Sequence, residues 1–313
     1  MLIPRYWSRA ESQATTPTGK RIQFHVWRGS RTDTAEADAL ARDAVERIAA
    51  RIQRGEGFPE RYAYGDRPLR EEVVRELPGG TDDAPDAAIT RNSYGALVLN
   101  AARVFFIDVD VEPTPPAPQP SSLWSMADKL LGRSAKDALP ASLRTMAEGI
   151  LGPSSASAPG DPAGGPLERL RGWIAARPDW RVRVYRTHSG MRYLVTHALF
   201  SPTEGESLTV MRALGADPQY VRLCAAQKSF RARLTPKPWR VGMENPPARF
   251  PYESPEDESA MRQWEARYAR ASEKFASAAL VEELGGGSEH PDAAPLVRLH
   301  DEHTRAGSGL PLA

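Results

Sequence analysis

Apolar residues recur every three to four positions in two stretches near the N-terminus, a spacing typical of amphipathic helices. The first stretch, 34–54, ends before two glycines and carries apolar side chains at Ala37, Leu40, Ala41, Ala44, Val45, Ile48 and Ile52. The second, 69–77, follows Pro68, and proline is favourable in the first turn of a helix. The pattern predicts helices over 34–54 and 69–77.

Alternating polar and apolar positions, rich in β-branched and aromatic residues, predict strands in both halves of the chain. The run from Val104 to Ile107 is continuously apolar, as expected of a strand that is buried on both faces. Short breaks on its N-terminal side indicate tight antiparallel connections. The predicted strands are 21–27, 86–92, 95–100, 103–109, 181–187, 191–197 and a last one that begins at 228.

The stretch 111–166 separates the two groups of predicted strands and is expected to be a linker or insertion. It begins with the Pro-rich VEPTPPAPQPSS, contains one weak helical pattern at 123–132, and is rich in Ser, Ala, Gly and Pro over 133–166. Such a composition cannot bury enough apolar surface to fold, so disorder is expected over 133–166.

Further helices are expected after this insertion, and the order of elements defines the fold class. They span 167–176, 203–214, 218–226, 255–284 and 294–305. Together the elements predict an α+β fold, a mostly antiparallel sheet flanked by helices, in a single decorated domain over 1–313. Residues 255–305 form its helical C-terminal extension.

Composition narrows the class of protein. The 313 residues carry a net charge of +1 and one cysteine, Cys224, which permits no internal disulfide and is expected to be a core thiol. The sequence has neither a membrane-length apolar run nor a signal peptide, so we expect a cytoplasmic protein with no membrane partner. Arginine supplies 35 of the 41 basic residues. That bias reduces the weight of any single arginine.

The strongest chemical signal is the pair Asp108 and Asp110 at the end of the apolar strand 103–109. Residues two apart in a strand point to the same face, and two adjacent carboxylates are costly unless a cation or a proton intervenes. Mg²⁺ or Mn²⁺ is the usual cation at such a pair in phosphoryl transfer. The alternative is an acidic strand end that continues into a solvated loop at Glu112.

A second group of candidates lies on the predicted hairpin 185–197. Arg186 and Arg192 are candidate phosphate ligands there. His197 ends a strand that can lie beside the Asp108 strand, whereas His188 is expected to be a surface residue at the turn. The alternative for His197 is an ordinary surface histidine.

A basic segment follows this hairpin, although the net charge of the whole chain is close to zero. Residues 177–240 contain twelve cations and four acidic residues, a local net charge of +8. Phe230 and Trp239 are interleaved with these charges, and basic residues beside aromatic ones suit phosphates and stacked bases. The candidates are Lys228, Arg231, Arg233 and Lys237. The alternative is arginine stems that cover a sheet edge.

The C-terminal segment 299–307 offers one more combination. His300 and His303 are three residues apart on a predicted helix, a spacing that could bind a metal. The alternative is a polar, solvated helix end.

Taken together, these motifs resemble the archaeo-eukaryotic primase superfamily over about 86–240. FFIDVD (105–110) is similar to its Asp-x-Asp strand, SGMRYLVTH (189–197) to its Ser-x-His hairpin, and FRARLTPKP (230–238) to its basic strand. The sequence departs from that pattern because Ser189 lies eight residues before His197, and the third acidic residue would be Asp217. TRNSYGALVLN and FRARLTPKPWR also resemble a group of uncharacterised bacterial proteins.

The resemblance implies a metal-dependent nucleotidyltransferase that acts on nucleoside triphosphates or a nucleic acid. Asp108 and Asp110 would then bind Mg²⁺ or Mn²⁺, His197 would contact the incoming triphosphate, and Arg231, Arg233 and Lys237 would hold phosphates. Two alternatives stay open: an inactive nucleic-acid or nucleotide-binding protein, and a structural protein whose partner contacts lie on helices 34–54 and 255–284. The sequence does not define the oligomeric state.

Overall fold

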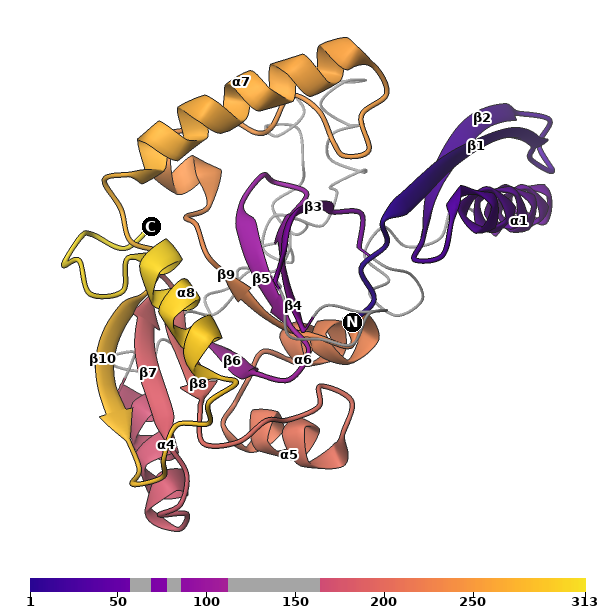
Figure 1. Ribbon diagram of the computed structural model, residues 1–313. Helices are drawn as coiled ribbons and strands as arrows, with labels where there is room; N and C mark the ends of the chain where they lie inside the picture. The colour runs from indigo at the N-terminus through magenta and orange to yellow at the C-terminus, as the bar shows by residue number, and fades with distance from the viewer. Residues whose placement is uncertain (57–68, 78–85, 112–163) are drawn as a thin grey trace, which may run out of the picture.

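The computed structural model describes residues 1–56, 69–77, 86–111 and 164–313. Helices and antiparallel sheets are both present in the described part of the chain, so the predicted α+β class is confirmed (Figure 1). The expectations for 112–163, including the helix at 123–132 and most of the disorder expected over 133–166, lie outside the described residues. The end of that stretch, 164–166, is instead the beginning of a helix.

The first four-stranded sheet carries the Asp108 strand at its edge. Its order is β10 (Ala279–Leu284), β7 (Val182–Thr187), β8 (Gly190–Val195) and β6 (Phe105–Asp110), with all neighbours antiparallel. Side chains alternate between its faces, and each face meets one helix. Tyr193 donates to a carbonyl in α4 (Gly164–Ala175), while Phe106 packs against His300 of α8 (Ala294–Thr304).

The second four-stranded sheet contains β3 (Glu72–Leu77), β4 (Ala87–Arg91), β5 (Leu97–Ala101) and β9 (Phe230–Arg233), in that order. Tyr220 joins the two sheets, because its hydroxyl lies 2.8 Å from the carbonyl oxygen of Phe106 in β6 and 3.0 Å from that of Arg231 in β9. Tyr220 belongs to α6 (Pro218–Gln227), which follows α5 (Gly205–Ala213). One buried apolar core spans both sheets and the helices against them.

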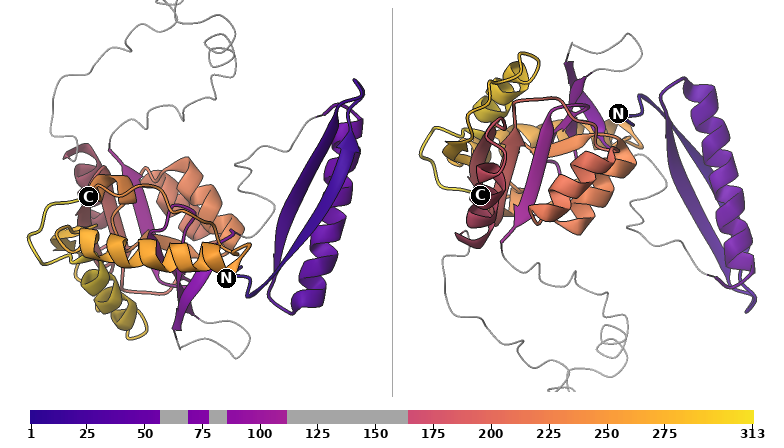
Figure 2. Two further views of the ribbon diagram at one scale, coloured as in Figure 1. Left: turned by 90° about the horizontal axis from the view of Figure 1, so that it is seen from above. Right: turned by 90° about the horizontal axis from the view of Figure 1, so that it is seen from below.

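The helix α7 (Pro255–Ser272) lies over the second sheet (Figures 1 and 2). Its Trp264 is fully buried against the β4–β5 turn at Gly95, where a Cβ atom would lie 2.3 Å from the indole. Gly95 also has φ +92°, a conformation that favours glycine. The turn is therefore fixed by packing and by backbone geometry together.

An N-terminal arm projects from this body (Figures 1 and 2). It comprises β1 (Tyr6–Thr15), β2 (Arg21–Ser30) and α1 (Thr34–Gln53), and it has a small apolar core of its own. The strand β1 was not predicted, because its sequence YWSRAESQAT lacks the apolar alternation that identifies a strand. The helix predicted over 34–54 is confirmed.

The helix predicted over 69–77 is wrong, and the one predicted over 255–284 is wrong in part. Residues 72–77 form β3, since Val73 and its neighbours pair with β4 and the strand ladder outweighs the weak helical spacing. The helix predicted over 255–284 ends at Ser272, and 279–284 form β10, which pairs with β7. The strand β6 also does not pair with β5, as the short connection suggested, but crosses to β8.

None of the described helices is both long and apolar enough to cross a membrane.

Candidate functional site

Asp108 and Asp110 point to the same face at the end of β6, as the strand period predicts. Val109 between them is buried on the opposite face, Asp108 is one-third exposed, and Asp110 is exposed. Asp108 lies opposite Arg192 of β8, and Asp110 lies opposite Gly190. The register therefore places a cation beside one carboxylate and the hairpin turn beside the other.

Arg192 binds Asp108 through two parallel hydrogen bonds. Its Nε donates to Oδ1 over 2.7 Å and its Nη2 to Oδ2 over 3.1 Å, a geometry that matches a carboxylate. Only 1% of Arg192 is exposed, and burial alone would lower its pKa, but the neighbouring carboxylate keeps that pKa above the usual value. This was a candidate phosphate ligand; in the structure it is committed to Asp108.

The remaining nitrogen of the Arg192 guanidinium, Nη1, contacts β9 and the helix α8. This nitrogen donates to the carbonyl oxygen of Arg233 over 2.9 Å and lies 3.3 Å from Nε2 of His300. A guanidinium has no acceptor, so Nε2 of His300 accepts and Nδ1 carries the proton. Nδ1 lies 3.0 Å from Oδ1 of Asp301, to which it donates.

His300 is fully buried, and this burial lowers its pKa to about 4, so the ring is neutral at physiological pH. Asp301 also accepts from the hydroxyl of Tyr185 over 2.6 Å and from Arg183 over 2.8 Å. His300 is thus neither the metal ligand nor the solvated residue expected from the sequence. It is a structural link between α8 and the Asp108 strand.

Asp110 lies in the opposite environment. Its pKa is raised by partial burial first and then by the negative charges of Asp108 and Asp217, while Lys237 and Arg233 counteract this effect. Asp217 caps α6, where its carboxylate accepts from the backbone amides that begin the helix, at 2.9 and 3.3 Å. The third acidic residue suggested by the resemblance therefore does lie near the pair, with a structural role of its own.

Cations gather on the other side of Asp110. Burial and the charges of Arg233 and Arg240 lower the pKa of Lys237 to about 8, with Asp110 acting in the opposite direction. Arg240, in the short helix Pro238–Val241, donates to Ser189 of the hairpin over 2.6 Å. Nε of Arg233 is buried and has no hydrogen-bond partner among the described residues. This nitrogen can therefore donate to a ligand without losing a bond to the described part of the chain.

An exposed aromatic residue borders these cations. Trp239 is 53% exposed, and its ring meets Tyr94 edge to face, with centroids 5.4 Å apart. Nζ of Lys237 lies 5.4 Å from the Trp239 ring centroid. We call Tyr94, Arg233, Lys237, Trp239 and Arg240 the Trp239 surface. Phe230, the other aromatic candidate, is fully buried in the core.

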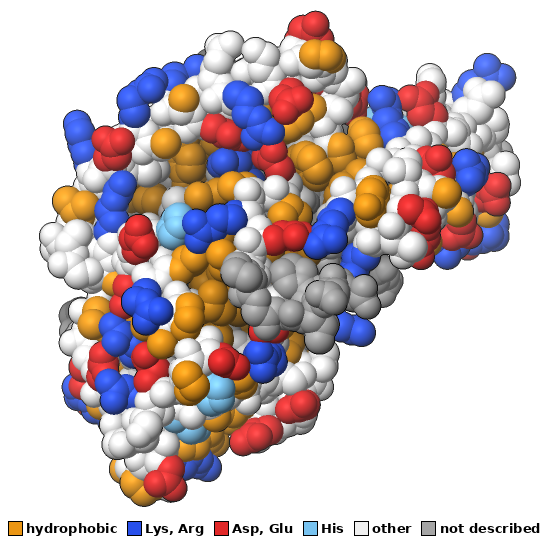
Figure 3. All heavy atoms as spheres, in the orientation of Figure 1, with side chains coloured by type: hydrophobic (Ala, Val, Ile, Leu, Met, Phe, Trp, Pro, Cys, Tyr) orange, Lys and Arg blue, Asp and Glu red, His pale blue; other side chains and the backbone are white. Residues whose placement is uncertain are grey.

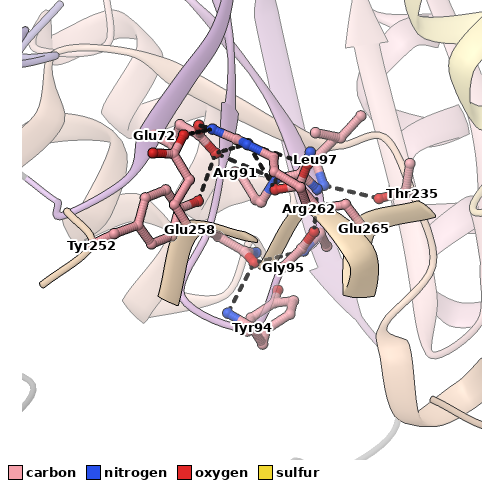
Figure 4. A network of polar contacts seen from close by, with 12 residues as sticks. Glu72, Arg91, Tyr94, Gly95, Leu97, Thr235, Tyr252, Glu258, Arg262 and Glu265 are labelled. Atoms are coloured by element: carbon pink, nitrogen blue, oxygen red, sulfur yellow. Dashed lines mark hydrogen bonds and ion pairs between the residues drawn. The ribbon is translucent and has the colours of Figure 1, made fainter. Parts of the chain in front are cut away.

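A charge network holds the turn that presents Tyr94 (Figure 4). Arg91 lies 3.0 Å from Glu265 of α7 and donates to the carbonyl oxygen of Gly95 over 3.0 Å. Arg262 of α7 binds Glu72 of β3 and, over 3.0 Å, Glu265. The network therefore fixes α7 to the second sheet and limits the movement of the Tyr94 turn.

Four predicted site residues lie away from this cluster. His197 is beyond the opposite end of β8, where its ring packs at a tilt of 38° against Trp180, with centroids 4.7 Å apart, and burial lowers its pKa. Arg186 is on the other face of the sheet, since its cross-strand neighbour is Met191. Lys228 caps the C-terminal end of α6, eleven residues after Asp217.

The fourth of these residues is Arg231, and the prediction that it is a surface phosphate ligand is wrong. It is 8% exposed and forms two hydrogen bonds to Glu71, of 2.8 and 3.0 Å, and another to Asn100. Cys224, by contrast, is the expected core thiol, and burial raises its pKa to about 12.

The residues around Asp108 and Asp110 do not fit the implied Mg²⁺ or Mn²⁺ site as they stand. Both oxygens of Asp108 accept from Arg192, so a metal would have to displace a buried cation. No group of three or more metal-ligating side chains occurs within the described ranges. Of the two carboxylates, Asp110 has no such bond to an arginine among the described residues. A single carboxylate is a weak site for a hard cation.

Figure 3 shows basic and acidic side chains interspersed over one face of both the arm and the body. That face therefore carries no extended basic field. No family model, curated protein or solved structure matches this chain.

Proposed function

We propose that the chain binds single-stranded nucleic acid at the Trp239 surface. The observation that carries the proposal is an exposed tryptophan beside Lys237, which in turn lies near Arg233 and Arg240. A base can stack on an aromatic ring, and neighbouring cations can bind the phosphates that flank that base. The fold class and the pair of carboxylates are compatible with this function but do not require it.

The electrostatics support a phosphate-bearing ligand. The pKa of Lys237 is lowered to about 8 by burial and by two arginines, so its charged form is costly in the absence of an anion. A phosphate at this position would offset that cost and give Nε of Arg233 an acceptor. Asp110 lies close enough to Lys237 and Arg233 to affect their charges, and its own negative charge opposes an anion bound at the same place.

Stacking supplies the second part of the proposed affinity. Base–aromatic stacking contributes about 1–3 kcal/mol per base and tolerates any sequence. The edge-to-face contact with Tyr94 fixes the orientation of the Trp239 ring, so less ordering is needed on binding. We therefore expect weak sequence preference and strong dependence on salt.

The test is fluorescence anisotropy of a labelled oligothymidylate of about 15 nucleotides, a length sufficient for one such site. We expect Lys237→Ala to weaken binding and to reduce the magnitude of the log–log salt slope by about 0.7, the value for one lost phosphate contact on a single strand. Lys228→Ala is the matched control, because Lys228 is exposed at the other end of α6. An equal loss of affinity in Lys237→Ala and Lys228→Ala, or binding that salt does not weaken, would contradict the proposal.

Nucleotidyl transfer is the second candidate. The observation that favours it is that Asp108 and Asp110 lie on one strand face beside Lys237 and Arg233. The test is incorporation of a labelled nucleotide with Mn²⁺ in wild type and in Asp110→Asn, since Asp108 variants also disturb Arg192. Incorporation lost in Asp110→Asn supports this candidate, and incorporation that is absent or unaffected removes it.

A further inference from the structure

A cavity of about 90 Å³ lies beside α7 and shares no lining residue with the Trp239 surface. It is bounded by the β4–β5 turn, at Asn92 and Ser93, and by the segment 246–252 that precedes α7. Phe250 and Tyr252 give it an aromatic wall, with their ring centroids 5.9 Å apart. The other walls are largely polar and charged.

The charges that line this cavity do not cancel. Arg91 forms an ion pair with Glu265 over 3.0 Å, and Glu72 binds Arg262, so both of these lining residues are paired (Figure 4). The other two charged lining residues are Arg70 and Arg249, and neither forms an ion pair with a described carboxylate. An excess of two positive charges therefore remains at the cavity.

Arg70 is held in place by backbone carbonyls instead of a carboxylate. Its Nε donates to the carbonyl oxygen of Phe250, and its Nη2 to those of Arg249 and Pro251, at 3.3 and 3.1 Å. Its guanidinium carbon also lies 5.1 Å from the ring centroid of Trp27. A guanidinium has five N–H groups, so the two on Nη1 are left without a hydrogen bond to the described chain. Arg70 thus keeps two donors for a ligand on a side chain whose position is fixed.

The positive charge of Arg70 is poorly compensated. Burial lowers its pKa to about 10 against the opposing effect of Glu253, and the charges of Arg249 and Arg9 lower it further. The carboxylate of Glu253 is itself paired with Arg9, over 3.4 Å. Because a carbonyl carries no net charge, an anion in the cavity would stabilise the charged form of Arg70.

The β4–β5 turn adds neutral donors. Oδ1 of Asn92 accepts from the backbone amides of Tyr94 and Ala96, at 3.3 and 3.0 Å, and these bonds fix the orientation of its side chain. Nδ2 of Asn92 and the hydroxyl of Ser93 make no hydrogen bond to the part of the chain that the structure describes. Both groups can therefore donate to a ligand while the turn keeps its geometry.

We propose that this cavity binds a phosphate group. The dianion of a phosphate monoester carries two charges and three terminal oxygens, which match the two guanidinium groups without a carboxylate and the donors of the turn. A carboxylate offers one charge and two oxygens, so it fits this set of donors less well. The aromatic wall favours a phosphate that is attached to an aromatic body. The proposal does not rest on nucleic-acid binding at the Trp239 surface.

The test is isothermal titration calorimetry of the full chain with phenyl phosphate and, for comparison, benzoate. We expect phenyl phosphate to bind with a dissociation constant below about 1 mM, and benzoate to bind more weakly. Arg249→Ala should weaken phenyl phosphate binding about tenfold, as expected for the loss of one charged hydrogen bond. Arg249 is exposed, so its removal should not disturb folding. Arg47→Ala is the matched control, because Arg47 is an exposed arginine of α1 outside the cavity and should leave the affinity unchanged.

Asn92→Asp tests the turn. The aspartate keeps the acceptor that the two turn amides need but replaces the Nδ2 donor with a negative charge, so phenyl phosphate binding should be lost. No binding by wild type at about 10 mM phenyl phosphate overturns the proposal. Benzoate that binds as tightly as phenyl phosphate, or an equal loss in Arg249→Ala and Arg47→Ala, also overturns it.

Competition with the labelled oligothymidylate distinguishes two sources of the phosphate. If phenyl phosphate displaces the oligonucleotide and Arg249→Ala weakens its binding, the cavity takes a phosphate of a nucleic acid. If oligothymidylate binding is unaffected by both, the cavity takes the phosphate of a small molecule. A chain that binds phenyl phosphate but no oligothymidylate keeps this site and loses the function proposed for the Trp239 surface, so the two failures are distinguishable.

Discussion

Asp108 and Asp110 have the same chemistry, but the structure assigns them opposite effects on stability. Asp108 is the charge partner of Arg192, whose guanidinium is 1% exposed. Removing one member of a buried ion pair leaves the other charge unpaired, at a cost of about 3–5 kcal/mol. Because the Asp108 side chain is 33% exposed, water can partly replace it. We therefore expect Asp108→Ala to lower the free energy of unfolding by about 3 kcal/mol.

Asp110→Asn is the matched variant. Burial and two neighbouring carboxylates raise the pKa of Asp110 above its ordinary value, so its charged form opposes folding at neutral pH. Loss of that charge is expected to leave the free energy of unfolding unchanged or higher. Urea denaturation followed by circular dichroism measures both variants under one condition.

Arg192→Met completes the comparison through a double-mutant cycle with Asp108→Ala. If the two side chains stabilise each other as the geometry indicates, the coupling energy is about 2 kcal/mol, and the double variant loses less than the two single losses added together. Additive losses, or an Asp110 variant less stable than the Asp108 variant, would refute the assignment of the buried cation to Asp108.

Two further predictions concern the packing around the site. Since the pKa of His300 falls from 6.5 to about 4 on folding, the unfolded chain binds more protons between these values, and the free energy of unfolding falls by up to about 3 kcal/mol as pH drops across them. His300→Gln should flatten that dependence in part; an unchanged profile would contradict it. Gly95→Ala would place a Cβ atom 2.3 Å from Trp264 at φ +92°, so it should lower the melting temperature by several degrees, whereas Gly165→Ala, in open space, should not.

Short-range patterns explain why much of the fold was predictable. The apolar run before Asp108 and the hairpin around Ser189 are local signals. The strand and the hairpin both form as expected, and β6 pairs with β8 of the hairpin. The errors arise where a segment becomes a strand only by pairing with another strand, whether that strand is the next along the chain or far away. The segments at 72–77 and 279–284 have helix-compatible patterns, and only β4 and β7 make them strands. No property of either segment alone identifies its partner strand.

The candidate site was less predictable, because strand direction decides which residues meet. The strand that ends at His197 does lie beside β6, but it runs antiparallel and places His197 at the far end. The predicted hairpin could have indicated Arg192 as the residue opposite Asp108. The role of His300 could not be read from its sequence, since it depends on α8 packing on the sheet from more than a hundred residues away.

The most direct test of the proposed function compares three side chains at position 239 in oligothymidylate binding. If Trp239 supplies a stacking surface, Trp239→Phe should keep most of the affinity, and Trp239→Ala should lose about 1–3 kcal/mol, roughly five- to 150-fold. The exposed ring contributes little to the core, so both variants should fold normally. Equal affinity in wild type and Trp239→Ala would contradict the claim that this surface binds nucleic acid.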